Sequence, residues 1–214
     1  MLVIAIDGPA GAGKSTVGRA VAQRLGLDYL DTGAMYRAVT FAALRRGVAV
    51  TDVGAVGELA RAIDLTVSDD GVYVDGVDAT LAIRTREVTE AVSPIAANSA
   101  VRTELRAQQR RWVDEHGGGV VEGRDIATVV FPDADLKVFV TASPRRRAER
   151  RVGEIGGDVV DVEASIIERD RLDRERTDGP LRVAQDSVVV DTTDMGIADV
   201  VDHIVGLLPA DDRR

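Results

Sequence analysis

Apolar residues occur along this chain in short continuous runs that alternate with stretches of helical periodicity. Residues 2–6 form the first run and precede a glycine-rich turn, after which residues 15–25 place apolar side chains three and four positions apart. A short apolar run bounded by turn residues is typical of a buried strand, and the second spacing is typical of an amphipathic helix. The alternation returns at three further apolar runs, residues 120–122, 136–141 and 187–191. The pattern predicts an α/β fold, with a parallel core sheet between two layers of helices.

Two segments interrupt this alternation and predict additions to the core. Residues 64–77 contain the turn signals Asp70-Gly71 and Asp75-Gly76, which predict a small antiparallel meander inserted into the fold. Residues 153–161 are polar and rich in glycine between two arginine-bearing helical stretches, which predicts a mobile loop or lid. A length of 214 residues leaves little room for two independent domains, so we expect one core with a flap and a lid.

Composition and charge narrow the classes of function. The formal net charge of −9 repels polyanions, which argues against nucleic acid and anionic membranes as partners. Because the sequence has no cysteine, disulfides, thiolate metal sites and cysteine nucleophiles are excluded. The first residues are apolar over only six positions and carry no basic leader, so we expect neither a signal peptide nor a membrane-spanning helix. The expected location is the cytoplasm.

The glycine-rich turn after the first run has the spacing of a phosphate-binding loop. It follows a predicted strand and opens a predicted helix, which is the context that this motif requires. In such a loop, backbone N–H groups surround the phosphates, Lys14 neutralises the β and γ oxygens, and the Ser15 hydroxyl ligates Mg²⁺. A supporting carboxylate for the metal could come from Glu122 or from Asp7. The predicted ATP-binding residues are Gly8, Pro9, Ala10, Gly11, Ala12, Gly13, Lys14, Ser15 and Thr16.

A phosphate loop alone does not separate kinases from GTPases, ATPases or transporter subunits. A guanine-reading Asn-Lys-x-Asp segment is excluded, because Asn98 is the only asparagine and Ala97 and Ser99 flank it. A GTPase switch protein is therefore disfavoured, and the later motifs must decide among the remaining classes.

Two later segments offer arginines to a phosphorylated acceptor. Arg37 lies on a predicted helix that Asp31 or Thr32 can cap, so that its guanidinium could reach a phosphate beside the loop. Arg124 and Asp125 follow a buried strand at its carboxyl end, where open parallel sheets bind ligands. The alternative for each segment taken alone is a surface segment with solvated or internally paired charges.

A third segment, residues 168–176, is a predicted helix of alternating charge. Arg169, Asp173 and Arg176 are spaced at i, i+4 and i+7, so they share one face and could present two cations and one anion to a ligand. The other reading is an ordinary exposed, charge-paired helix. The residues expected to point away from that face are Asp170, Arg171 and Arg174.

These segments, in this order, resemble the bacterial cytidylate kinase family over nearly the whole chain. The shared motifs are IDGPAGAGKS, LDTGAMYRA, the meander leading to Ile83-Arg84, EGRDIATVVFPDA and the arginine-rich helix at 168–176. The resemblance implies a P-loop nucleoside monophosphate kinase with an inserted NMP-binding subdomain and a short lid. The implied parts are a core of about 1–36, 93–147 and 165–214, an insert of about 37–92 and a lid of about 148–164.

The resemblance also implies roles for individual residues. The residues that match Arg37, Arg124 and Arg176 hold the acceptor phosphate in that family. Those that match Ser93, Arg102 and Asp125 face the cytosine ring, whose N4 amino group suits a carboxylate. Those that match Arg169 and Asp173 lie near the sugar. The predicted substrate-binding residues are Thr32, Tyr36, Arg37, Ser93, Arg102, Arg124, Asp125, Arg169, Asp173 and Arg176.

The implied activity is transfer of a phosphoryl group from ATP, with Mg²⁺, to CMP or dCMP by a monomer. Positioning and charge neutralisation would do most of the catalysis, and Arg147, Arg150 or Arg151 would close over the transferring group with the lid. The alternatives are a P-loop kinase for UMP, AMP or a shikimate-like acceptor, and an ATP-binding regulatory module without turnover. The predicted catalytic residues are Lys14, Arg37, Arg124, Arg147, Arg150 and Arg151.

Overall fold

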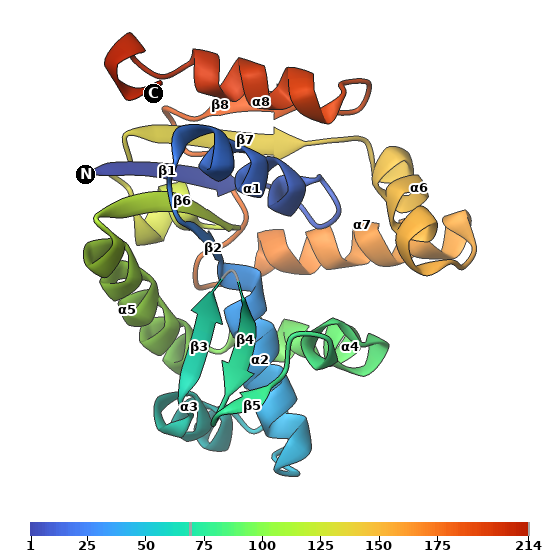
Figure 1. The fold of residues 1–214 in the computed structure, drawn as a ribbon. Helices are drawn as coiled ribbons and strands as arrows, with labels where there is room; N and C mark the ends of the chain where they lie inside the picture. Colours follow the sequence, from blue (N-terminus) through green and yellow to red (C-terminus); the bar gives the residue numbers. More distant parts are fainter. Residues whose placement is uncertain (69, 214) are drawn as a thin grey trace. The chain divides into compact units, whose positions relative to one another are not determined.

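The computed structural model describes residues 1–68 and 70–213, and only the backbone of Ile155. The chain divides into two compact units, drawn in Figure 1: a first unit of Met1–Tyr29 with His116–Arg214, and a second unit of Leu30–Glu115. The finer division into core, insert and lid stays a prediction. Of the helices in the described part of the chain, none combines the length and the hydropathy needed to cross a bilayer.

A five-stranded sheet organises the first unit, and all of its strands except β2, which continues into the second unit after Tyr29, lie wholly within it. Its strands are β1 (Leu2–Asp7), β2 (Tyr29–Asp31), β6 (Gly118–Gly123), β7 (Leu136–Thr141) and β8 (Val188–Asp191), in the order β2-β6-β1-β7-β8. The central strand β1 pairs in parallel with β6 and β7, and β7 pairs in parallel with β8. Because parallel strands end at the same edge, the loops that follow β1, β6, β7 and β8 meet at one edge of the sheet.

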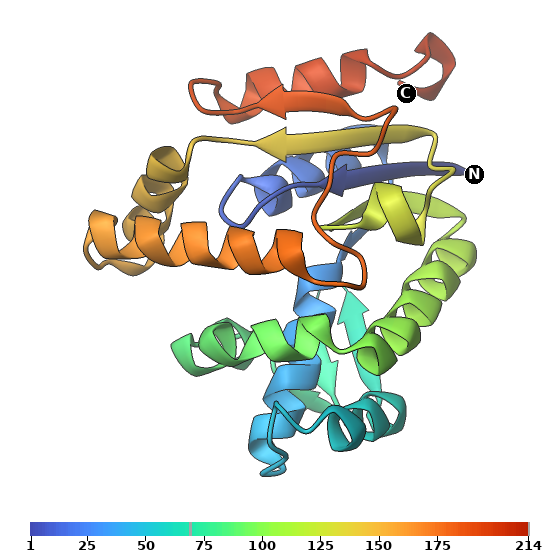
Figure 2. The same ribbon diagram turned by 180° about the vertical axis from the view of Figure 1, so that it is seen from behind.

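Apolar side chains bury the sheet against helices of the first unit. The helices are α1 (Lys14–Leu25), α6 (Pro144–Ile155), α7 (Val159–Glu175), α8 (Ile197–Gly206), a π-helical turn η2 (Ile126–Val130) and a 3₁₀ turn η3 (Ala210–Asp212). Helices α1 and α8 pack beside one another on one face of the sheet (Figures 1 and 2). Val21 of α1 and Ile204 of α8 are fully buried in one core with Ile4 and Val138 of the strands. Removing such side chains from water stabilises the fold by about 25 cal/mol per Å².

The loop expected over residues 153–161 is shorter than the sequence predicted. Helix α6 continues to Ile155 and α7 begins at Val159, so only residues 156–158 lie outside the two helices. The physical reason is a helix cap, because the Asp158 carboxylate accepts from the N–H groups of Val160 and Asp161 at 2.8 and 3.3 Å. The glycines therefore make a tight turn of a helical hairpin.

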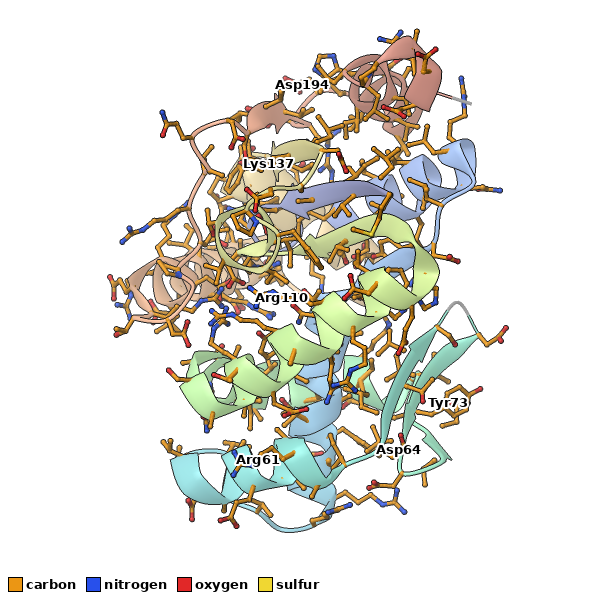
Figure 3. All side chains as sticks on the ribbon, turned by 90° about the vertical axis from the view of Figure 1, so that its left-hand side faces the viewer. Arg61, Asp64, Tyr73, Arg110, Lys137 and Asp194 are labelled. Carbon is orange, nitrogen blue, oxygen red and sulfur yellow. The ribbon has the colours of Figure 1, made fainter. Side chains whose placement is uncertain are left out.

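The second unit contains the predicted meander. Its elements are α2 (Thr32–Arg45), α3 (Val53–Ala62), β3 (Leu65–Ser68), β4 (Gly71–Val74), β5 (Val77–Asp78), η1 (Ala82–Arg84), α4 (Arg86–Ala97) and α5 (Ser99–His116). Strands β3, β4 and β5 form an antiparallel sheet, with Tyr73 on β4 (Figure 3). At the second turn Asp75 has a φ of 52° and accepts from the Asp64 N–H at 3.1 Å. Residue 69, within the first predicted turn region, lies outside the described residues. The predicted fold class, a parallel core sheet with helices and a small antiparallel sheet, is confirmed.

Candidate active site

The phosphate loop occupies residues 8–13, between the end of β1 and the start of α1. Gly8 has a φ of +150°, and a Cβ at this position would lie 1.9 Å from the carbonyl oxygen of Val140 on β7. Only glycine lets the chain leave β1 so close to the neighbouring strand. The loop therefore starts at a fixed point beside the sheet, and α1 directs its N-terminus into it.

Two side chains of the loop have defined partners. Lys14 is buried, and its Nζ donates to the carbonyl oxygen of Pro9 at 2.9 Å, which folds the side chain back over the loop. The Ser15 hydroxyl donates to Oε1 of Glu122, at the end of β6, at 2.6 Å. A hydroxyl beside a carboxylate is an oxygen donor pair of the type that Mg²⁺ prefers. Within residues 1–68 and 70–213 no cluster of three or more His, Cys, Asp or Glu forms a metal site.

Asp7 joins the phosphate loop to the segment after β6. Its two carboxylate oxygens accept from the N–H groups of Ile126 and Ala127 at 2.9 and 2.8 Å. Burial outweighs these bonds and raises the pKa of Asp7 to about 6, with a further contribution from the charge of Asp125. Of the two carboxylates considered for a metal, Asp7 thus contacts η2, whereas Glu122 contacts the Ser15 hydroxyl.

An arginine cluster, defined as Arg124, Asp125, Asp173 and Arg176, joins the end of β6 to the end of α7. Arg124 Nε donates to Asp173 Oδ2 at 2.8 Å. Arg176, the C-cap of α7, lies 3.6 Å from a carboxylate oxygen of Asp173 and 3.6 Å from one of Asp125. Burial alone would raise the pKa of Asp173, but the neighbouring arginines outweigh burial and lower it. The structure thus brings four predicted site residues together, and the charge of Arg169 acts on Asp173 as well.

The three predicted lid arginines of α6 have different surroundings. Arg150 donates to the Thr192 carbonyl oxygen at 2.5 Å and to its hydroxyl at 3.1 Å, beside the carboxyl end of β8. Arg151 is half-buried and pairs with Glu154 one turn later on the same helix. Arg147 is only 3% exposed. The three side chains therefore cannot have the same role.

Asp170 is a buried residue next to the predicted site. Its spacing on the helix predicted that it would point away from that face with Arg171 and Arg174, but it is 3% exposed and accepts from Arg147 Nη2 at 2.7 Å. The reason is that α7 packs against α6, which buries a second face of the helix. Ile166 lies one turn before Asp170 and is the other buried residue of α7, so it was the available signal that this position faces inward.

In the second unit, Asp31 organises the start of α2. Its Oδ1 caps the helix by accepting from the Ala34 N–H at 2.9 Å, as predicted. Its Oδ2 lies 3.6 Å from Arg37 and 3.7 Å from Arg84. Thr32 is buried at the first helical position. Arg84 was not among the predicted site residues, although it belongs to one of the recognised motifs.

Arg102 and Tyr36 form a second contact within this unit. The Arg102 guanidinium lies 5.5 Å from the centre of the Tyr36 ring and donates to the Ala96 carbonyl oxygen at 2.9 Å. Arg102 is 1% exposed although it lies on a helix of polar composition. Ser93 is half-buried on α4. The predicted site residues thus divide between the units, with Thr32, Tyr36, Arg37, Ser93 and Arg102 in the second unit and the others in the first.

Comparison with known proteins gives one consistent family. The family model described as cytidylate kinase matches residues 4–210. A protein of Mycobacterium leprae (strain Br4923) named cytidylate kinase is 48% identical over 212 residues, covering 97% of this chain and 95% of that protein. A bifunctional pantoate ligase/cytidylate kinase of Trichormus variabilis is 50% identical over 216 residues, which are 95% of this chain and 40% of that protein.

Solved structures with lower sequence identity share the fold. A shikimate kinase from Bacteroides thetaiotaomicron is similar with a TM-score of 0.50 and 15% identity, covering 96% of this chain and 97% of that one. An uncharacterized protein from Eubacterium ventriosum ATCC 27560 has a TM-score of 0.54 and 11% identity, with coverage of 96% and 97%. At these identities the likeness concerns the fold alone.

Proposed function

Since this chain belongs to the cytidylate kinase family, we propose that it transfers the γ-phosphoryl group of ATP to CMP or dCMP, giving CDP or dCDP and ADP. The observation that best supports this activity is the pairing of two features in the first unit. A phosphate loop holding Lys14 follows β1, and the arginine cluster follows the neighbouring strand β6 of the same sheet. A donor site and groups for an anionic acceptor thus share one sheet edge.

ATP binds along the phosphate loop in this proposal. The N–H groups of Gly8 and residues 10–16 and the N-terminus of α1 attract the phosphates, and Lys14 exchanges the Pro9 carbonyl for phosphate oxygens. Ser15, with Glu122 beside it, would hold Mg²⁺. When bound, the metal would neutralise charge on the β- and γ-phosphates.

The acceptor nucleotide binds through arginines and a few base-reading groups. Arg124, Arg176 and Arg37 bind its phosphate, because guanidinium forks suit phosphate oxygens. Asp125 accepts from the cytosine N4 amino group, whereas uracil would present an oxygen to the same carboxylate. The remaining proposed contacts are Ser93 and Arg102 with the base, Arg169 and Asp173 with the sugar, and Thr32 and Tyr36 at the start of α2.

Phosphoryl transfer then needs no general base, because the acceptor phosphate is already ionised at neutral pH. An acceptor oxygen forms a bond to the γ-phosphorus while the bond from that phosphorus to the β–γ bridging oxygen breaks. Arginines stabilise the charge on the equatorial oxygens. Of the three arginines of α6 predicted for this role, Arg147 is held by Ala142, Ala10 and Asp170, so we propose that Arg150 or Arg151 assists at the donor side. We also propose that the protein is monomeric and cytoplasmic.

The test is a coupled ADP-release assay with purified protein, Mg²⁺ and ATP, across CMP, dCMP, UMP, AMP and shikimate. We expect CMP and dCMP to give the highest kcat/KM, and light scattering to report a monomer. Preference for AMP, UMP or shikimate would assign another acceptor. ATP binding without turnover of any acceptor would instead support a regulatory module.

A further inference from the structure

The Arg147 side chain connects three separate parts of the first unit. Its Nε donates to the Ala142 carbonyl oxygen at 3.0 Å, Nη1 to the Ala10 carbonyl oxygen at 2.8 Å and Nη2 to Asp170 Oδ2 at 2.7 Å. The first partner follows β7, the second lies in the phosphate loop and the third lies on α7. Arg147 and Asp170 are only 3% exposed each, so water does not compete for these bonds.

The bond to Ala10 fixes the direction of a loop peptide. In a trans peptide the carbonyl of one residue and the N–H of the next point in opposite directions. Anchoring the Ala10 carbonyl to Arg147 therefore turns the Gly11 N–H away from that arginine, toward the opposite side of the loop backbone. Gly11 has a φ of +75°, and a Cβ there would lie 3.3 Å from the Arg147 Cβ, so the arginine packs directly on this peptide.

Other carbonyls of the loop are also held by side chains, but with different consequences. Lys14 holds Pro9 at 2.9 Å, and Thr192 approaches the Ala12 carbonyl at 3.3 Å. Lys14 must leave its carbonyl to reach ATP, and the Thr192 contact is long for a hydroxyl donor. Arg147 also donates to the buried carboxylate of Asp170, and this charge-assisted bond restricts its guanidinium.

We propose that Arg147 and Asp170 are positioning residues that preset the Ala10–Gly11 peptide of the phosphate loop to bind the phosphates of ATP. This inference rests on the proposed kinase function, in which the loop binds ATP. Arg147 acts from behind the loop, through the peptide, and does not touch the transferring phosphoryl group. Asp170 acts through Arg147, so that α7 supports the donor site as well as the arginine cluster.

The chain offers a matched control for the experiment. Arg145 of α6 pairs with Glu163 of α7 at 3.4 Å, so it joins the same two helices, but this pair is more exposed, and the other ion pair of Arg145 is with Glu149 of its own helix. The test compares Arg147→Gln, Arg147→Lys, Asp170→Asn and their double variant with Glu163→Gln. Binding of the fluorescent analogue mant-ATP is titrated without acceptor, and KM values for ATP and CMP and melting temperatures are measured for each.

We expect the Arg147→Gln variant to raise the Kd of mant-ATP and the KM for ATP by about tenfold or more, with the KM for CMP within about twofold. Asp170→Asn should change the same constants less, and the double variant should match Arg147→Gln because both residues act on one peptide. Arg147→Lys keeps the positive charge and Asp170→Asn keeps the side-chain shape. If Arg147→Gln does not fold, the nucleotide-binding constants of these two variants test the proposal instead. Glu163→Gln should leave all constants unchanged.

Three results would overturn the positioning role. These are a loss of kcat with unchanged mant-ATP binding, a change confined to the KM for CMP, and equal effects of Asp170→Asn and Glu163→Gln. Failure of the proposed function would look different, because wild-type protein would then fail to phosphorylate CMP. The mant-ATP titration would still report whether Arg147 and Asp170 set the loop.

Discussion

The phosphate loop and the arginine cluster both offer positive charge to phosphate, but they are built in opposite ways. The loop relies on backbone N–H groups and a helix N-terminus, and Lys14 is the one cation in the motif. The cluster relies on side chains, with Arg124 and Arg176 set against the carboxylates of Asp125 and Asp173. In the loop the geometry is determined by the chain path, whereas in the cluster each cation is held by a neighbouring anion.

The difference predicts how each region responds to its ligand. Backbone amides need not leave a partner of opposite charge, so the loop is ready for an anion once Lys14 moves. The cluster is close to charge balance, and its arginines must give up part of their interaction with the carboxylates to bind a phosphate. The Arg124–Asp173 hydrogen bond of 2.8 Å and the 3.6 Å separations of Arg176 from both carboxylates are the interactions that a phosphate would compete with.

The largest expected effect tests the loop through its single cation. Lys14→Ala should lower kcat by roughly 10³-fold, about 4 kcal/mol, because backbone amides cannot replace a full charge at the γ-phosphate. Steady-state kinetics with CMP measure the loss, and circular dichroism checks the fold. Lys137, which pairs with Asp186 at 2.6 Å, is the only other lysine, so Lys137→Ala is the matched control. A near wild-type kcat in the Lys14 variant would remove the loop from the mechanism.

The next effect tests the cluster. Arg124→Ala should lower kcat/KM by about 100-fold, near 3 kcal/mol, because a half-buried cation is lost and Asp173 is left without its hydrogen-bonded partner. The reduction should be the same for CMP, dCMP and UMP, since the phosphate carries no information about the base. Arg171→Ala, on an exposed face of α7, should change little. A defect that depends on the base would assign Arg124 to base recognition.

The same contrast explains what the sequence could predict. The phosphate loop could be predicted from the motif between Gly8 and Ser15 and from the apolar run before it. A site built from backbone groups depends on the local sequence. The Asp31 cap and the meander were predicted for the same reason, each being a short-range feature. The pairing of Arg147 with Asp170 could not be predicted, since it depends on how α6 and α7 pack.

Residue roles were harder to predict where a charge pattern had two meanings. The face of Arg169, Asp173 and Arg176 was chosen by spacing, yet α7 ends at Glu175 and Arg176 acts as its C-cap. The glycine-rich stretch 153–161 contained both loop signals and a capping aspartate at position 158, and the cap determined most of the structure. Which carboxylate an arginine contacts is a tertiary property that local periodicity does not determine.

A third prediction concerns the support beneath the loop, where Asp7 holds η2. Its pKa is raised to about 6 in the folded state against 3.8 for an ordinary aspartate, so the folded protein binds this proton more tightly. Stability from Asp7 is therefore present at low pH and is lost as pH rises from about 4 to 7, by about 2 kcal/mol.

The measurement is urea unfolding without nucleotide or metal, at pH 4 and at pH 7, for wild-type protein and Asp7→Asn. The free energy of unfolding of the wild type should fall relative to the variant as pH rises, because the variant cannot titrate at this position. Parallel pH profiles for the two proteins would show that Asp7 has an ordinary pKa, and that its two amide bonds offset the effect of burial.

The smallest expected effect separates the two functions that the cluster combines. Asp125→Ala removes a carboxylate that lies 3.6 Å from Arg176 and that we propose contacts the cytosine N4 group. The preference for CMP over UMP should fall about tenfold, near 1.4 kcal/mol, because uracil no longer faces an acceptor oxygen. Asp133→Ala, an exposed aspartate after η2, controls for the loss of a negative charge. Unchanged selectivity, with both acceptors weakened equally, would mean that Asp125 serves only to orient Arg176, and the cluster would then recognise phosphate alone, as the loop does.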